Sequence, residues 1–262
     1  MIELSLIIVF IALAIASYTD IKKREVPDWL SFSFIAASLA YALSRSVVDW
    51  SLIPITNSIL GLAIFWIIAN ILYYGRLFAG GDAKLLAGIG AALGINLSFL
   101  INTLIIGGLY GLVYSLVLAL IHIKTVKAEF GKVKIKKIPF ILLAFFSLAL
   151  GIIMNSFVFY LITALAVISP LLYAFTFAVE KSALIKLVHP EKLAEGDWLA
   201  SDLKIGNQMI KSNFEGLSKS EISLIKKANK PVKIKYGLPF VPVFFLAFLA
   251  ELTFGNLFLV FI

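Results

Sequence analysis

The sequence predicts an all-α polytopic membrane protein with about eight transmembrane segments, six being the lower bound, and a small α+β cytoplasmic insert. Two observations predict this class. Of the 262 residues, 61% are hydrophobic and 15% are charged, whereas a soluble domain carries about 25% charged residues. Several apolar runs also approach the roughly 20 residues that a helix needs to cross a bilayer.

Eight apolar segments justify the count of spans. The alternating pattern of an outer-membrane barrel is absent from them, so we expect helices. The fourth and sixth segments are short and are expected to tilt or to rely on neighbouring helices. The eight segments cover residues 3–19, 29–44, 52–74, 83–95, 97–121, 139–153, 157–179 and 238–257.

The positions of the basic residues test this count. Every lysine and arginine except Arg45 falls within residues 20–28, 75–84, 122–138 or 180–237. These four intervals lie on one side if each segment crosses once. The positive-inside rule then places them in the cytoplasm and both termini outside, in the cell membrane. The net charge of +8 is thereby explained by topology and by contact with anionic lipid headgroups, and no nucleic-acid partner is expected.

The composition excludes several kinds of chemistry. The chain has no cysteine, which excludes disulfides, cysteine-ligated metals and thiol catalysis. His122 and His189 are too few and too far apart for a histidine-based metal site. We therefore expect neither a metal ion nor another cofactor.

Three parts are expected along the chain. Residues 1–180 form the transmembrane catalytic helix bundle, residues 181–236 the cytoplasmic insert, and residues 237–262 a C-terminal transmembrane segment. The insert is the longest polar stretch. It is so small that we expect its stability to depend on docking at the membrane face.

Short patterns predict the elements of the insert. The stretch "SKSE" at 218–221 is a capping box, which predicts a helix from there to about Ala228. The stretch "VKIKY" at 232–236 alternates like a β-strand. We expect "SDLKIG" at 201–206 to be its partner strand.

Two aspartates are the candidate catalytic residues. Asp20 ends the first segment in "ASYTDIKKREVPDWL", and Asp82 opens the fourth in "FAGGDAKLL". The predicted topology places both at the cytoplasmic edge of the membrane. An ionised carboxylate is energetically costly in a membrane segment and often marks a functional site. Two carboxyl groups that share a proton can activate water and protonate a leaving amine. For either residue alone, a helix cap at a wet interface is the commoner explanation.

The two glycines before Asp82 fit a crowded site. Gly80 and Gly81 lack a Cβ atom, so a substrate strand or a neighbouring helix can approach the carboxylate closely. Asp82 also suits the N-cap position of the fourth segment, where its carboxylate would accept a backbone N–H.

These motifs resemble those of a known family. "GGDAKLLAGIGAALG" and "DIKKREVPDWL" resemble the two aspartate motifs of the archaeal type IV prepilin peptidases, which include the preflagellin (prearchaellin) peptidases. These are membrane aspartic proteases of the GxGD class. "EGDWL", "EGLSKSEI" and "YGLPFVP" resemble the insert and the start of the final helix in archaeal members. The chain departs from GxGD at one position, because Ala79 stands where the first glycine is expected.

The resemblance implies an aspartic endopeptidase without a cofactor. It would remove the short basic leader of pilin-like or archaellin precursors at the cytoplasmic membrane face. Many bacterial relatives also methylate the new terminus and carry paired Cys-x-x-Cys motifs. Because this chain lacks cysteine, we expect peptidase activity only.

Further residues are expected to shape the site or bind substrate. The resemblance makes Lys84 part of the site, although snorkelling to lipid headgroups explains it equally well. Glu25 could pair with a basic leader, but charge balance with its basic neighbours is the simpler explanation. The resemblance implies that Pro239, Phe240 and Pro242, in "GLPFVP", lie near the aspartates and help to hold the substrate; the alternative is an ordinary helix start. Pro242 is expected to unwind the start of the last segment.

Two other functions compete with the peptidase. Carboxylates in membrane segments also mark ion paths, as in a membrane transporter. Against a transporter, both aspartates are predicted at one face, and the sequence shows no inverted repeat. The third alternative is a non-catalytic membrane scaffold, in which both aspartates are helix caps.

Overall fold

The structure is a computed structural model that describes residues 4–75, 77–135, 137–206, 208–213 and 216–260. Contacts within the chain divide it into two compact units. Unit 1 comprises Met1–Leu112 and Gly237–Ile262, and unit 2 comprises Val113–Tyr236. The division into residues 1–180, 181–236 and 237–262 stays a prediction.

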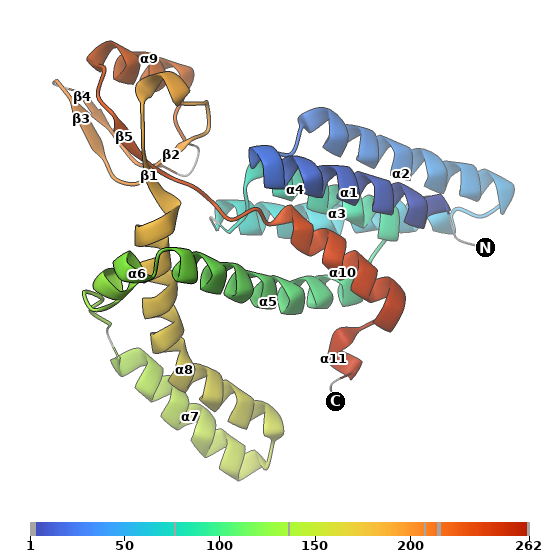
Figure 1. The fold of residues 1–262 in the computed structure, drawn as a ribbon. Helices are drawn as coiled ribbons and strands as arrows, with labels where there is room; N and C mark the ends of the chain where they lie inside the picture. The colour runs from blue at the N-terminus through green and yellow to red at the C-terminus, as the bar shows by residue number, and fades with distance from the viewer. Residues whose placement is uncertain (1–3, 76, 136, 207, 214–215, 261–262) are drawn as a thin grey trace. The chain divides into compact units, whose positions relative to one another are not determined.

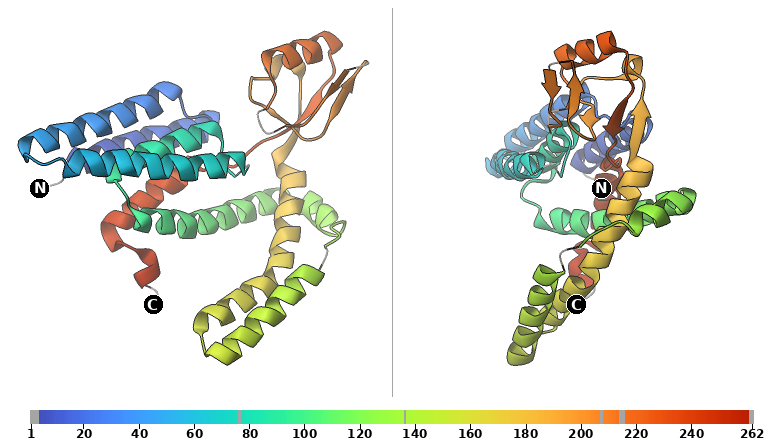
Figure 2. Two further views of the ribbon diagram at one scale, coloured as in Figure 1. Left: turned by 180° about the vertical axis from the view of Figure 1, so that it is seen from behind. Right: turned by 90° about the vertical axis from the view of Figure 1, so that its left-hand side faces the viewer.

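Unit 1 is a helix bundle in which α1, α2, α3 and α4 run side by side (Figures 1 and 2). α10 comes from the far end of the sequence and lies along α1. The first part of α5 and the short α11 complete the unit. The helices are α1 (Leu4–Lys23), α2 (Asp28–Val48), α3 (Ile53–Tyr74), α4 (Gly80–Leu93), α5 (Leu97–Ile121), α10 (Val241–Phe254) and α11 (Leu257–Val260).

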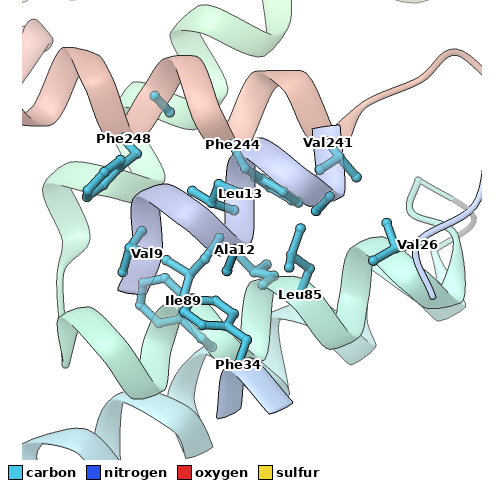
Figure 3. Close-up of a cluster of buried hydrophobic side chains, with 14 of the residues drawn as sticks. Val9, Ala12, Leu13, Val26, Phe34, Leu85, Ile89, Val241, Phe244 and Phe248 are labelled. Atoms are coloured by element: carbon cyan, nitrogen blue, oxygen red, sulfur yellow. The ribbon is translucent and has the colours of Figure 1, made fainter. Parts of the chain in front are cut away.

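The core of unit 1 joins α1, α4 and α10. Leu13 of α1, Leu85 of α4 and Phe244 of α10 are fully buried in one apolar cluster (Figure 3). α4 also packs against α3 through glycines, since a Cβ atom at Gly61 would meet the carbonyl oxygen of Gly90. Small residues permit this close approach of helices in membrane proteins. The core therefore fixes the two helices that carry the aspartates.

Unit 2 contains further apolar helices and the polar insert. α7 and α8 form an antiparallel hairpin (Figure 1), and α6 packs on α8 near the end of the latter. A π-helical turn, η1, continues α8. The helical elements are α6 (Ile123–Phe130), α7 (Ile138–Met154), α8 (Phe157–Val179), η1 (Glu180–Leu184), the 3-10 turn η2 (Pro190–Lys192) and α9 (Lys219–Ala228).

The insert folds as a three-stranded antiparallel sheet of order β1-β5-β2, a separate hairpin β3-β4 and helix α9. Ile222 and Ile225 of α9 pack into the core that contains Ile234 of β5. Figure 2 shows α9 beside the strands. The strands are β1 (Ile185–Val188), β2 (Trp198–Leu199), β3 (Leu203–Ile205), β4 (Gln208–Ile210) and β5 (Val232–Lys235).

Most of the predicted elements of the insert are confirmed, but one pairing is wrong. Ser218 caps α9 in a capping box with Glu221, and residues 232–235 form β5, as predicted. The segment 201–206 does contain a strand, β3, but it pairs with β4 and not with β5. The partners of β5 are β1 and β2. β3 and β4 are neighbours in sequence, and a short hairpin costs less chain entropy than a distant pairing.

Each predicted apolar segment forms a helix, namely α1, α2, α3, α4, α5, α7, α8 and α10. Among the described residues, five helices are long and apolar enough to cross a membrane by length and composition. They are α1, α2, α3, α5 and α8 with its continuation to Leu184. These helices support a multi-pass membrane protein. α4, α7 and α10 have 14, 17 and 14 residues, so a count of eight spans stays a prediction.

Candidate active site

Asp20 lies in the last turn of α1 and is buried, with 6% of its surface exposed. Its carboxylate oxygen Oδ2 accepts a hydrogen bond of 2.9 Å from the backbone N–H of Val241, the first residue of α10. The first N–H groups of a helix have no partner within the helix, and a carboxylate is a favourable acceptor for them. The structure therefore couples Asp20 to a segment 221 residues away in the sequence.

A second contact ties the end of α1 to the segment before α10. Arg24 has a positive φ of 58° and donates its backbone N–H to the carbonyl of Asp20 at 2.8 Å. Its guanidinium Nη1 donates to the carbonyl oxygen of Gly237 at 3.2 Å. Residues 237–241 are thus held to the end of α1 at both of their ends.

Asp82 lies in the first turn of α4 and is also buried, with 9% of its surface exposed. Its Oδ2 accepts a hydrogen bond of 3.2 Å from the backbone N–H of Ala79. The predicted backbone acceptor role is confirmed, but the predicted position is wrong. Ala79 is the N-cap residue, and Asp82 reaches back to it from the third helical position, as an acidic residue does in a capping box.

The bundle brings the two aspartates into one site. α1 and α4 share the buried core of unit 1 through Leu13 and Leu85. The carboxyl groups of Asp20 and Asp82 are near enough to interact electrostatically. Each is buried, and each is oriented by one backbone N–H. Burial disfavours two negative charges beside each other, and this is the condition under which a close pair of carboxyl groups shares one proton.

The two glycines before Asp82 differ in their surroundings. A Cβ atom at Gly81 would lie 3.0 Å from Cβ and 3.4 Å from the backbone nitrogen of Val26. Val26 belongs to the connection that follows Asp20. A Cβ atom at Gly80 would meet only Tyr73, at 3.8 Å from Cε2. The close approach expected of both glycines therefore occurs at Gly81, between the two aspartate motifs.

Lys84 joins α4 to α2. Its Nζ lies 2.6 Å from Oδ1 of Asp28, the first residue of α2. The same ammonium group lies 5.6 Å from the ring centroid of Phe32, within the range of a cation–π interaction. Lys84 therefore fixes α4 relative to α2 in this structure. Glu25 is exposed in the connection between α1 and α2.

The segment before α10 reaches the site, as the sequence suggested. Pro239 is buried, and Phe240 packs against Phe78 and Phe244 with ring centroids 5.1 and 5.5 Å apart. Pro242 lies in the first turn of α10, where proline needs no hydrogen-bond partner. The expected unwinding at Pro242 is therefore wrong.

Phe78 was missed by sequence reasoning. It is buried and lies four residues before Asp82, and its ring also packs edge-on against Phe244, with centroids 5.7 Å apart. It thereby links the connection that leads to Asp82 with the helix whose N–H binds Asp20. An aromatic residue two positions before the pair of glycines is the only signal of it in the sequence, and a chain with 22 phenylalanines makes that signal weak.

The described residues include no group of three or more His, Cys, Asp or Glu side chains that could hold a metal ion. What the site offers is two carboxyl groups, with one backbone N–H on each. Such a pair can accept a proton from water at one carboxylate and donate a proton to a leaving group from the other.

Comparison with known proteins shows what part of the chain is similar to. Residues 7–116, which hold both aspartates, match the type IV leader peptidase family. Over 83 residues the chain is 32% identical to a preflagellin peptidase of Methanococcus maripaludis, covering 31% of this chain and 35% of that protein. Over 81 residues it is 31% identical to a preflagellin peptidase of Methanocaldococcus jannaschii, covering 31% of this chain and 34% of that protein.

The chain thus spans about a third of the length of the curated relatives it matches. No solved structure matches it. The resemblance predicted from the aspartate motifs is confirmed by these comparisons, in which residues 7–116 match the type IV leader peptidase family.

Proposed function

We propose that the protein is an aspartic endopeptidase that removes the short basic leader from pilin-like or archaellin precursors at the cytoplasmic membrane face. The observation that carries this proposal is the pair Asp20 and Asp82. Both are buried in one helix bundle, and both lie within the segment that matches the type IV leader peptidase family. The names of the two curated relatives support a precursor of the flagellin type as substrate.

The proposed reaction needs one ionised and one protonated carboxyl group. The ionised group takes a proton from water, which attacks the carbonyl carbon of the scissile bond. The protonated group supports the developing oxyanion and supplies a proton to the leaving amine. The backbone N–H groups of Val241 and Ala79 would keep the two carboxyl groups in position, so that less freedom is lost when substrate binds.

The remaining site residues have proposed supporting roles. Gly81 allows the two aspartate segments to approach each other, and Lys84 holds α4 against α2. Pro239 and Phe240 lead into α10, and Pro242 lies in its first turn, beside the N–H of Val241 that binds Asp20. Gly80 and the exposed Glu25 lie where a precursor with a basic leader could be contacted.

A cleavage assay tests the proposal. The full-length protein in detergent is mixed with a pilin-like precursor that carries a basic leader, and the products are identified by mass spectrometry. Asp20→Asn and Asp82→Asn should each reduce cleavage by roughly 10²–10⁴-fold, the usual contribution of general acid–base catalysis. Asp49→Asn is the matched control, because Asp49 forms an exposed ion pair with Arg45 after α2.

Two results would overturn the proposal. One is full activity in either Asp20→Asn or Asp82→Asn, because the proposed reaction requires both carboxyl groups. The other is the absence of cleavage by the parent protein across several precursors. The transporter and the non-catalytic scaffold would then explain the buried carboxyl groups better.

A further inference from the structure

Unit 2 contains a groove that the proposed peptidase reaction does not use. It lies along the hairpin of α7 and α8 and has a volume of about 780 Å³. Its lining includes Phe140 and Ala144 of α7 and Ala166 and Pro170 of α8. Lys137, directly before α7, also lines the groove.

The packing of α7 against α8 differs between the two ends of the hairpin. Towards the turn between the helices, α7 and α8 touch closely. A Cβ atom at Gly151 would lie 3.0 Å from Cε1 of Tyr160, and the hydroxyl groups of Ser147 and Thr163 are hydrogen-bonded at 2.9 Å. Towards the other end, small alanines and Pro170 face the space between the helices. The groove lies over these small residues, between larger apolar side chains such as Phe140 and Leu171.

Polar groups of α8 along the groove already have partners. Pro170 has no N–H to donate to the carbonyl of Ala166, and the Ser169 hydroxyl donates to that carbonyl at 2.9 Å instead. Thr163 donates to the carbonyl of Phe159 at 2.8 Å. The groove therefore presents an apolar surface, which suits a hydrocarbon chain.

The rim of the groove is basic. Lys137 is exposed there, and the preceding segment carries Lys124, Lys127, Lys132 and Lys134. The acidic residue of this segment, Glu129, forms a salt bridge of 2.6 Å with Lys132. An apolar groove with a positive rim is complementary to an amphipathic anion.

We propose that this groove binds one anionic membrane lipid, with a hydrocarbon chain between α7 and α8 and the phosphate at Lys137. The volume falls within the roughly 300–1,000 Å³ of small-molecule sites. The charge of the rim favours this occupant over a precursor with a basic leader, which the lysines would repel. The proposed lipid site does not depend on the proposed peptidase activity, so an experiment can refute one proposal and leave the other unaffected.

Native mass spectrometry of the full-length protein in detergent tests the headgroup. Phosphatidylglycerol and phosphatidylcholine with identical chains are added in turn. One phosphatidylglycerol should remain bound, and phosphatidylcholine should not. Lys137→Gln should weaken retention of phosphatidylglycerol about fivefold, the usual effect of one lysine near an anionic headgroup. Lys132→Gln changes the net charge equally but removes a lysine already paired with Glu129, and should have little effect.

A second pair of variants tests the groove itself. Ala144→Phe places a ring in the groove, whereas Ala164→Phe places the same ring on an exposed position of α8 outside the lining. Only Ala144→Phe should abolish retention of the lipid. The proposal is wrong if both headgroups are retained equally, or if the two lysine variants, or the two phenylalanine variants, behave alike. A lipid-free dimer held together through this groove would also overturn it.

Discussion

Gly81 is a residue at which the backbones of the two aspartate motifs approach each other closely. Its lack of a side chain accommodates Val26, which follows the first motif. The GxGD pattern requires glycine at residue 81 and leaves residue 80 open, but it gives no physical reason for the difference. The structure separates them, since only Gly81 has a neighbour that a methyl group would displace.

We predict that Gly81→Ala impairs cleavage about tenfold or more, while Gly80→Ala leaves it nearly unchanged. The added methyl group at Gly81 would overpack against Val26, and overpacking costs about 1–3 kcal/mol, where 1.4 kcal/mol corresponds to a factor of ten. Initial rates on a precursor peptide measure the effect. A loss of the same size in both variants would contradict this account of the glycines.

Helix α4 is held at its start by an ion pair as well as by the core. The pair of Lys84 and Asp28 is partly exposed, with 40% and 64% of the side chains accessible, so its contribution to stability is expected to be below about 1 kcal/mol. Its expected effect is on alignment, because it joins the second turn of α4, directly after the turn that contains Asp82, to the first turn of α2.

We predict that Lys84→Gln and Asp28→Asn each reduce cleavage by the same few-fold factor and that the double variant is no worse than either. Two residues whose effect passes through one shared contact give this non-additive result. Rates for the four proteins of the cycle provide the measurement, and thermal unfolding in detergent controls for stability. A much larger loss in Lys84→Gln than in Asp28→Asn would instead indicate that Lys84 contacts the substrate directly.

Helix α9 depends on its capping box. The Ser218 backbone N–H donates to Glu221 Oε2 at 2.9 Å, and the Glu221 N–H donates back to Ser218 Oγ at 3.4 Å. Ser218→Ala should cost about 1 kcal/mol and raise hydrogen exchange in α9 about fivefold. Ser223→Ala is the matched control, because its hydroxyl bonds only the exposed carbonyl of Ser220. Equal exchange in both variants would mean that the cap does not limit opening of the helix.

At the level of elements, patterns within short stretches of sequence predicted the helices, because interactions between near neighbours in the chain determine where a helix forms. The apolar runs became helices, and the capping box of Ser218 started α9. The pairing of β3 could not be predicted, because alternating residues suit any neighbouring strand. The contact between Asp20 and Val241, and the packing of Phe78 on Phe240, join segments far apart in sequence. No spacing or periodicity within the sequence reports such contacts.

For the whole molecule, sidedness depends on whether α4 crosses the membrane. α4 has 14 residues, which corresponds to about 21 Å at 1.5 Å per residue, less than the roughly 30 Å of the hydrocarbon core. It is also largely buried by α1, α2 and α3, so it need not match the bilayer as a lipid-exposed helix must. The basic residues argue that it crosses, because otherwise the lysines of 122–138 would lie outside, against the positive-inside rule.

Single cysteines distinguish these topologies directly, because the chain has none of its own. We predict that a membrane-impermeant maleimide added to intact cells labels Leu52→Cys and Met154→Cys, both exposed near helix ends, but not Lys134→Cys or Lys230→Cys. Permeabilised cells should show labelling at all four positions.

If only the five long helices crossed, α5 would end outside, and Lys134→Cys would be labelled while Lys230→Cys stayed protected. That result would remove α4 from the spanning helices. The lysines of 122–138 would then have no topological explanation, whereas protection of Lys134→Cys would place the basic segments and both aspartates at the same face of the membrane.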